Sequence, residues 1–379
     1  MKKMMDSLSS PNLKIRDQGL VAGLFNLAIA DENLTASLAT KENLDTILAA
    51  SRKLNADNDK DEIGRRNMSG ALGNILKNNP DLAQGEAALE AKSLLINWAK
   101  TVNDHHSIKA ISGALSDLSK SKVDKDKDGL FAGQDAKETL IEMAKNATSA
   151  VAVASVFGAI ASVNWQLHEQ RKYAKENGLE GPAELYDDKE TYDFIMTMAE
   201  KMDGAKGKDG DDARGAIAGA IASISLGEKG GERFCNQETK ELMLNWGNKA
   251  KSDNAIIGVA SAISSIALHE SNMLKKQAQE NNKSIFYNDP EIKDVLATMD
   301  QKLKAGQDGQ DHSRAENAVK TAQKSSSPRE QKSEQQSWAD RVPPPKDSQP
   351  VARESTEGQT WEGKVAARAA STSSGVNLP

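Results

Sequence analysis

Four carboxylates lie close together between Asp124 and Asp135, and their spacing suits a metal ion. Counted from Asp124, the acids stand at positions 1, 3, 5 and 12 (Asp124, Asp126, Asp128 and Asp135), with Gly129 at position 6 for a sharp turn. Carboxylate oxygens at such spacing can surround a hard cation such as Ca²⁺. A site of this kind would make the chain a calcium-responsive regulator, and no other cofactor is expected.

The same segment resembles an EF-hand calcium loop but departs from it at both ends. The twelfth residue is Asp135, where the EF-hand pattern has a glutamate that binds through both oxygens. The stretch Lys120–Val123 before the loop is too short for a full entering helix. Aspartate, lysine and glycine are also ordinary turn residues, so a polar turn between two helices explains the same composition. Both interpretations stay open on sequence alone.

Other reactive residue types lack the partners that catalysis needs. His105 and His106 follow Asp104, but adjacent histidines at a helix start point in different directions, so no metal site is expected there. Cys235 is the only cysteine and has no nearby histidine in sequence, which favours a packed small residue over a nucleophile. No phosphate-binding loop or dinucleotide glycine fingerprint occurs. The sequence therefore predicts that the protein is not an enzyme.

An internal repeat accounts for many of the glycines and alanines. Six segments share two small residues, then an apolar residue, then another apolar residue three positions later. They begin 42 to 48 residues apart, except for one interval of 61 residues. A helical unit that recurs with a period in the forties is typical of an α-solenoid. The six segments are residues 22–27, 70–75, 113–118, 158–163, 219–224 and 261–266.

A second amphipathic element lies between these segments. Its apolar residues recur at i, i+3, i+4 and i+7, as a half-buried helix requires. The long interval contains an insertion around residues 171–189, which we expect to protrude as a loop. The second elements are residues 43–54, 93–102, 137–147, 191–202, 238–250 and 291–303.

Residues 22–54 (AGLFNLAIADENLTASLATKENLDTILAASRKL) resemble the armadillo pattern, in which a long third helix ending in ALxNLA leads into two shorter helices. The resemblance extends over residues 12–303, and HEAT-like stacking is its near alternative. It implies an all-α fold, a right-handed α-solenoid of about five to six armadillo-like repeats with a disordered C-terminal tail. In such a fold the third helices line a concave surface.

The resemblance also implies where a protein or peptide would bind. In armadillo proteins that bind extended peptides, an asparagine in successive third helices pairs with the peptide backbone, because its amide both donates and accepts hydrogen bonds. Only two of the matching positions keep the asparagine, so a complete ladder is not expected. These positions are Asn26, Asn74, Asp117, Ser162, Ser223 and Ser265.

Four residues before each of these positions the chain has a small residue, where armadillo proteins of nuclear import have tryptophan. Recognition of an import signal is therefore not expected. The small residues predict either the floor of a binding surface, better suited to a partner helix than to a strand, or close packing between neighbouring helices. They are Ala22, Gly70, Gly113, Gly158, Gly219 and Ser261.

The C-terminal segment, residues 304–379, is rich in proline and serine and is predicted to be a disordered tail after an array of residues 1–303. Two stretches of it align as E-x-Q-[ST]-W-x-x-[KR]-V, around Trp338 and Trp361. Because tryptophan is costly to leave exposed, we expect these two residues to fill apolar pockets on a partner. The pocket could also lie on the chain's own concave surface.

Charge and hydropathy narrow the class of partner. The formal net charge is −6, and no basic stripe is apparent, so nucleic acid is not expected. No apolar stretch follows Met1–Asp6, and Ala150–Val163 is too short to span a bilayer, which predicts a cytoplasmic protein without membrane contact. The leading hypothesis is a non-catalytic scaffold or adaptor. Its alternatives are the calcium-responsive regulator and a secreted bacterial effector that binds host proteins in the host cytoplasm.

Overall fold

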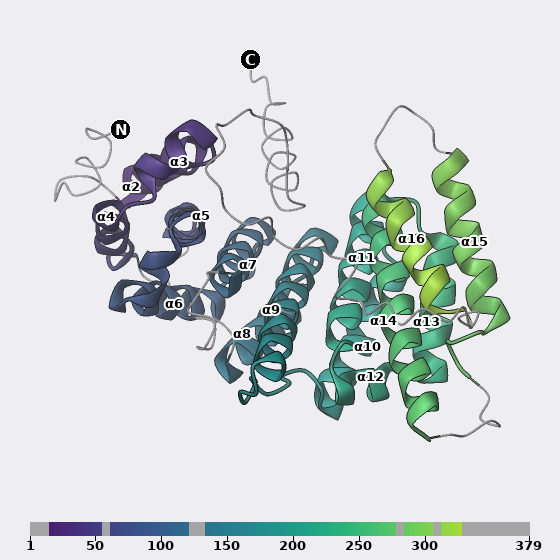
Figure 1. Ribbon diagram of the computed structural model, residues 1–379. Coiled ribbons are helices and arrows are strands. Elements are labelled where there is room, and N and C mark those ends of the chain that lie inside the picture. The colour runs from purple at the N-terminus through teal and green to yellow at the C-terminus, as the bar shows by residue number, and fades with distance from the viewer. Residues whose placement is uncertain (1–14, 55–60, 121–132, 278–283, 306–311, 328–379) are drawn as a thin grey trace, which may run out of the picture. The chain divides into compact units, whose positions relative to one another are not determined.

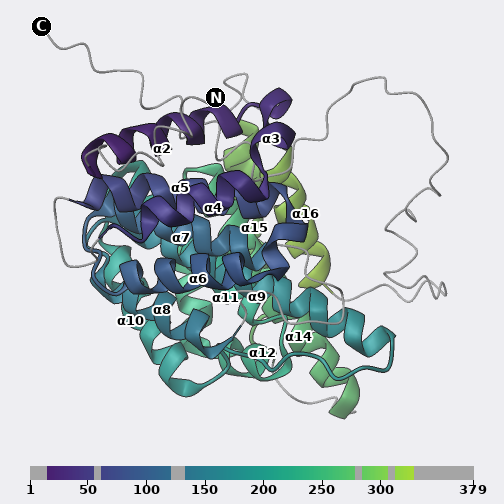
Figure 2. The same ribbon diagram turned by 90° about the vertical axis from the view of Figure 1, so that its left-hand side faces the viewer.

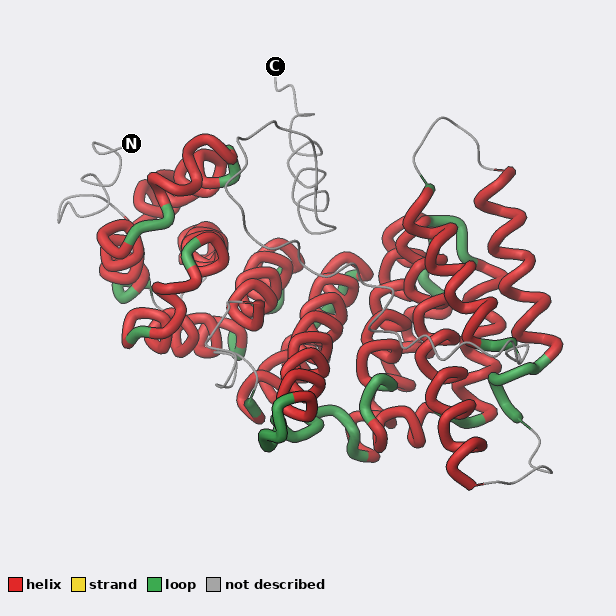
Figure 3. The backbone as a smooth tube through the Cα atoms, viewed as in Figure 1, coloured by secondary structure: helices red, strands yellow, loops and turns green. Residues whose placement is uncertain are grey.

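The computed structural model describes residues 15–54, 61–120, 133–277, 284–305 and 312–327. Within these ranges every regular element is a helix, and no strand occurs (Figure 3). All of these residues belong to one compact unit, Met1–Arg329. The predicted all-α fold is therefore confirmed for the described part of the chain.

Several helices begin where a side chain caps the first turn. Thr40, Ser149, Asp188 and Asn236 each have extended backbone, and each accepts a hydrogen bond from the backbone N–H three residues later. Such a bond satisfies one of the amide groups that a helix start leaves without a partner. Local sequence thus fixes where four helices start: α4 (Lys41–Ser51), α9 (Ala150–Glu176), α10 (Lys189–Asp203) and α13 (Gln237–Lys249).

The described helices form six consecutive units, preceded by α2 (Ile15–Ile29). Each unit has a second helix and a third helix, and three units also have a short first helix. The second helices are α4 (Lys41–Ser51), α6 (Glu86–Ala99), α8 (Gln134–Asn146), α10 (Lys189–Asp203), α13 (Gln237–Lys249) and α15 (Pro290–Ala305). The third helices are α5 (Glu62–Asn78), α7 (His105–Lys120), α9 (Ala150–Glu176), α11 (Gly207–Ile224), α14 (Asp253–Gln277) and α16 (Ser313–Ser325). The short first helices are α3 (Glu32–Leu38), the 3₁₀ helix η2 (Pro80–Gln84) and α12 (Glu228–Phe234).

The third helices stack in chain order. Starting from α2, each packs against the third helix of the next unit as far as α16, and each also packs against the second helix of its own unit (Figures 1 and 2). Every unit therefore buries its apolar face against its neighbours, which is the arrangement expected of a helical repeat array. The prediction of a helical repeat array is confirmed for the described residues.

The recurring apolar positions form the core. In the five units that contain them, the first apolar position is buried throughout (Leu72, Leu115, Ile160, Ile221 and Ile263), and so is the second (Ile75, Leu118, Val163, Ile224 and Ile266). Trp98 and Trp246, at the ends of α6 and α13, are also fully buried. The Trp246 indole N–H donates to Asp203 Oδ1 at 3.0 Å. The apolar residues that recur in the sequence are thus the residues that each repeat contributes to the core.

The insertion predicted to protrude is instead fastened to the array. Helix α9 continues to Glu176, and Tyr186 in the following loop is 1% exposed. Glu184 accepts the backbone N–H of Glu228 at 2.9 Å, and Arg233 donates to the carbonyl of Asp187 at 2.6 Å. The prediction was wrong because hydropathy alone did not reveal the polar groups that bind the loop to α12.

The array also extends past residue 303. Helix α16 lies inside the segment predicted as tail, and its Ala315, Val319 and Ala322 are fully buried. Ser264 on α14 donates a hydrogen bond to Ser325 at 3.0 Å. The sequence did not reveal this helix because a single large apolar residue, Val319, stands among small and polar ones.

Helix α9 is long and apolar enough to cross a membrane by length and composition alone, and half of that stretch is buried. It lies between α7 and α11, which cover it on two sides. Its apolar character therefore serves contacts between helices in this fold.

Candidate functional site

Three of the predicted small residues lie on a surface that the array leaves open. At Gly113 on α7, Gly158 on α9 and Gly219 on α11, an added Cβ would meet no described atom within 4 Å. These glycines occupy the same place in three successive third helices. We call the side of α7, α9 and α11 that carries this row the open face. On α5 the matching Gly70 is covered, because a Cβ there would lie 2.8 Å from Asn26 Nδ2.

Other glycines on the same helices have a different environment. A Cβ at Gly73 would lie 2.9 Å from Ala114 Cα, and one at Gly215 would lie 2.5 Å from the carbonyl oxygen of Asn254. At Gly258 it would overlap the carbonyl oxygen of Gly215. Gly73, Gly215 and Gly258 therefore allow neighbouring helices to pack closely. Gly113, Gly158 and Gly219 of the predicted row do not contribute to such packing.

An exposed tryptophan stands beside the open row. Trp165 follows Gly158 by seven residues, which is about two turns, so both residues lie on the same side of α9. Its side chain is 50% exposed. Ile63 near the start of α5 is also exposed, at 46%. Sequence reasoning missed Trp165, although its distance from Gly158 was a usable signal.

The two predicted asparagines meet each other instead of facing solvent freely. Asn26 Nδ2 donates to the carbonyl of Asn67 at 2.7 Å, and Asn74 Nδ2 donates to Asn26 Oδ1 at 3.4 Å. Asn67 in turn donates to the carbonyl of Gly19 at 2.9 Å. These amides join α2 to α5, so the Asn26 side chain is already engaged within the array.

The side chains at the other four predicted positions differ in their burial and in their bonding partners. Asp117 lies 3.6 Å from Lys77 Nζ and joins α7 to α5 as an ion pair. Ser223 is buried, and its hydroxyl donates to the carbonyl of Ala220 at 2.9 Å. Ser162 and Ser265 are half-buried on α9 and α14. The structure thus places the row on successive helices, but its polar groups do not form a uniform ladder.

The predicted calcium ligands fall mostly outside the described residues. Asp124, Asp126 and Asp128 lie there, and only Asp135 is described. Its Oδ2 pairs with Lys92 Nζ at 2.7 Å, and its Oδ1 accepts the N–H of Ala136 at 2.9 Å. Across the described ranges, no group of three or more histidine, cysteine or acidic side chains is placed to hold a metal ion. Trp338 and Trp361 also lie outside the described residues.

Cys235 sits in an environment that suppresses thiolate formation. Its side chain is half-buried at the end of α12. Burial, together with the nearby carboxylate of Glu270, raises the pKa of the thiol to about 12. Because the thiolate is the nucleophilic form, this cysteine is poorly suited to nucleophilic chemistry.

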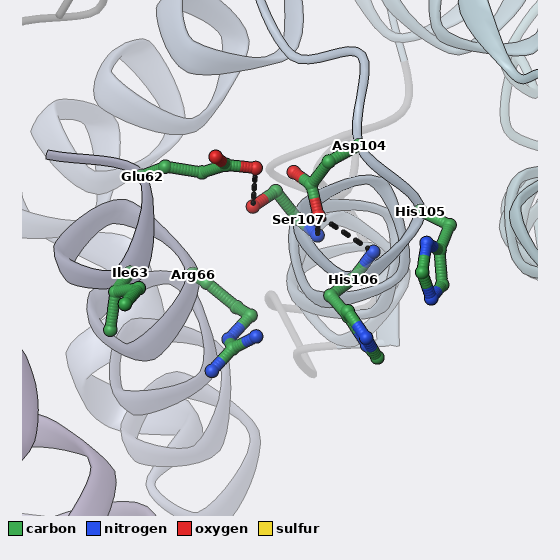
Figure 4. A pocket seen from close by; sticks show the side chains of 7 residues that line it. All are labelled: Glu62, Ile63, Arg66, Asp104, His105, His106 and Ser107. Carbon is green, nitrogen blue, oxygen red and sulfur yellow. Dashed lines mark hydrogen bonds between the residues drawn. The ribbon is translucent and has the colours of Figure 1, made fainter. Parts of the chain in front are cut away.

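A cavity of about 310 Å³ lies where α5 and α7 begin, lined by Glu62, Ile63, Arg66, Asp104, His105, His106 and Ser107 (Figure 4). Asp104 Oδ1 caps α7 by accepting the N–H groups of His106 and Ser107 at 2.9 and 3.0 Å. The Ser107 hydroxyl donates to Glu62 Oε1 at 3.4 Å. A shared hydrogen bond with Asp104, together with burial, raises the pKa of Glu62 to about 6.

Comparison with solved structures finds similarity to two engineered proteins at low sequence identity. One is a designed armadillo repeat protein with 14% sequence identity. The match covers 85% of this chain and 98% of the designed protein, with a TM-score of 0.40. The other is an engineered protein, also with 14% sequence identity. That match covers 86% of this chain and 98% of the engineered protein, with a TM-score of 0.25. No family model and no curated protein matches the sequence.

Proposed function

We propose that this protein is a non-catalytic scaffold that binds another protein through the open face. The row of Gly113, Gly158 and Gly219 supports this proposal most directly. Glycine is costly inside a helix, by about 1 kcal/mol relative to alanine. Where a glycine is not needed for helix packing, close approach by a partner supplies a physical reason for that cost.

The surroundings of the row favour a partner helix with apolar side chains. A floor without side chains lets a second helix approach the backbone closely, and Trp165 offers a large apolar anchor beside it. Tryptophan buries much area with few rotatable bonds, and such residues contribute most to binding at many interfaces. An extended peptide held by an asparagine ladder fits less well, because Asn26 and Asn74 bond within the array.

The test begins with affinity capture by the full chain, followed by calorimetry with each purified candidate partner. On the proposed function, Trp165→Ala and Gly158→Leu each weaken binding. Two variants serve as matched controls: Leu89→Ala removes an apolar side chain that is 55% exposed on α6, and Gly204→Leu adds bulk at a turn glycine with open surroundings. If the controls weaken binding as much as the open-face variants do, the open face is not the binding surface.

The duplicated tryptophan motif would give the scaffold a second means of binding. Two copies centred on Trp338 and Trp361, 23 residues apart, could engage two pockets of a partner at high effective concentration. Trp338→Ala and Trp361→Ala are then expected to lose far more binding together than either loses alone. Equal capture by all of these variants and by the unchanged chain would rule the motif out as a binding element.

A further inference from the structure

The cavity between α5 and α7 lies at the edge of the open face. Ile63 precedes Gly70 by seven residues on α5, and His106 precedes Gly113 by seven residues on α7. Both residues line the cavity. Since seven residues make about two helical turns, the opening lies about two turns from Gly113 on the same side of α7, where a partner that extends beyond the glycine row would reach it.

Basic side chains that form no ion pair within the described residues lie at or next to this opening. Arg66 and His106 line it, and Lys109 follows His106 by about one turn on α7. The side chains of these three residues form no ion pair or hydrogen bond with any described residue, and Arg66 is half-buried. Burial lowers the pKa of His106, and the charges of His105, Arg66 and Lys109 lower it further. These positive charges outweigh the opposing effect of Asp104 on His106. The local field at His106 is therefore positive.

The acidic groups of the cavity are directed elsewhere. Asp104 caps the first turn of α7, and Glu62 accepts the Ser107 hydroxyl. Figure 4 shows Glu62 and Ser107 on one side of the cavity, while Arg66 and His106 extend side by side toward the other. An anion that approached from that second side would meet the guanidinium and the imidazole first.

We propose that Arg66 and His106, assisted by Lys109, bind a carboxylate side chain of the partner that lies on the open face. This inference rests on the proposed function and names one chemical feature of the partner. An arginine presents two parallel N–H donors to a carboxylate, and a protonated histidine adds a third charge-assisted hydrogen bond. Ile63, 46% exposed at the same opening, would contact an apolar side chain next to the acid.

Binding would be linked to protonation of His106. An incoming carboxylate favours the charged imidazolium, so the bound state takes up a proton and affinity rises as pH falls through the range in which the imidazole titrates. Asp104 also favours the cation, whereas His105, Arg66 and Lys109 oppose it. A bound carboxylate would raise the pKa of His106 and so favour its imidazolium form.

The experiment uses the peptide acetyl-Leu-Glu-Glu-Leu-amide as a probe and follows the imidazole resonances of the full chain by NMR. The chain has five histidines, and a His106→Gln variant assigns the resonance of interest. We expect the peptide to shift this resonance and to raise its titration midpoint, while the matched Leu-Gln-Gln-Leu peptide leaves both unchanged. Arg66→Gln should weaken binding of the acidic peptide by about fivefold or more, because one charge-assisted pair is lost. Lys100→Gln, an exposed lysine after α6, should not.

Equal shifts with the two peptides, or an Arg66→Gln variant that binds as the unchanged chain does, would overturn the proposal. Inorganic phosphate is a separate arm: if it binds and the acidic peptide does not, the site prefers phosphate and the carboxylate assignment fails. With a purified partner, Arg66→Gln and Gly158→Leu are measured in parallel. Loss of binding in the second variant alone rejects the carboxylate site and keeps the open face, whereas no loss in either variant rejects the proposed function.

Discussion

Gly215 and Gly219 lie one turn apart on α11, yet their surroundings are opposite. A Cβ at Gly215 would meet the carbonyl oxygen of Asn254 at 2.5 Å and Ala255 Cα at 2.8 Å, whereas one at Gly219 would meet no described atom within 4 Å. The first glycine lets α14 pack against α11, and the second faces outward. Glycine on these helices thus marks two surfaces, one for neighbouring repeats and one that the repeats leave open.

The two tryptophans on the third and second helices extend this comparison and should give the largest difference in stability. Trp246 is 1% exposed and bonds to Asp203, whereas Trp165 is 50% exposed. Trp246→Ala is expected to lower the free energy of unfolding by about 3–5 kcal/mol, since it leaves a cavity in the core. Trp165→Ala should change it by no more than about 0.5 kcal/mol. Urea denaturation followed by far-UV circular dichroism measures both, and similar losses would mean that Trp165 is a core residue.

Substitutions of Gly215 and Gly219 should change the free energy of unfolding by less, and in opposite directions. Gly215→Ala is expected to destabilise the fold by about 1–3 kcal/mol, because the new methyl group meets backbone atoms of α14 that cannot move independently. Gly219→Ala should stabilise it by up to about 1 kcal/mol through the higher helix propensity of alanine. The same denaturation experiment compares both variants with the unchanged chain. Equal shifts would show that the two glycines do not serve different surfaces.

Larger substitutions on the open row separate binding from stability. Replacing Gly113 and Gly158 by leucine adds bulk where the described surroundings are empty, so the melting temperature should change little. Affinity for a partner identified by capture should fall about tenfold or more, which corresponds to roughly 1.4 kcal/mol. Calorimetry and thermal melting are run on the same samples. Aggregation or unfolding of this variant would assign both glycines to packing.

The sequence predicted the repeat because its apolar positions recur, but a period does not show whether a neighbour is present. Leu72 and Ile75 on α5 are buried, whereas the matching Leu24 and Leu27 on α2 are 56% and 67% exposed. The same pattern of side chains is present in both helices. On α2, no described second helix precedes it to cover them.

The candidate site was predicted in outline only. Small residues on successive third helices were found by their spacing, and Gly113 and Gly158 do lie on an open surface. The roles of individual polar groups depend on atoms from the next repeat, as for Asn26, whose amide bonds to α5. The basic cluster of Arg66 and His106 joins residues from two repeats, 40 positions apart, and no local pattern in the sequence brings them together.

The smallest expected effect concerns pH at the edge of the open face. Glu62 has a pKa of about 6 in the fold against an ordinary 4.5, through its hydrogen bond with Asp104 and through burial. The folded state therefore holds this proton more tightly, and the associated stability is complete below about pH 4.5 and is lost as pH rises through about 6. Asp104 behaves in the opposite sense. Burial alone would raise its pKa, but hydrogen bonds from Glu62 and Ser107 lower it to about 2, so its contribution fades as pH falls from about 4 toward 2.

Glu62→Gln tests this assignment, because its amide can donate to Asp104 at every pH. The unchanged chain should lose about 0.5 kcal/mol relative to this variant between about pH 4.5 and pH 7, after allowance for screening by solvent. Urea denaturation of both proteins at the two pH values measures the difference, and titration of all other groups cancels between them. Parallel pH profiles would show that Glu62 and Asp104 share no proton. The edge of the open face would then owe its charge to Arg66, His106 and Lys109 without a contribution from a protonated Glu62.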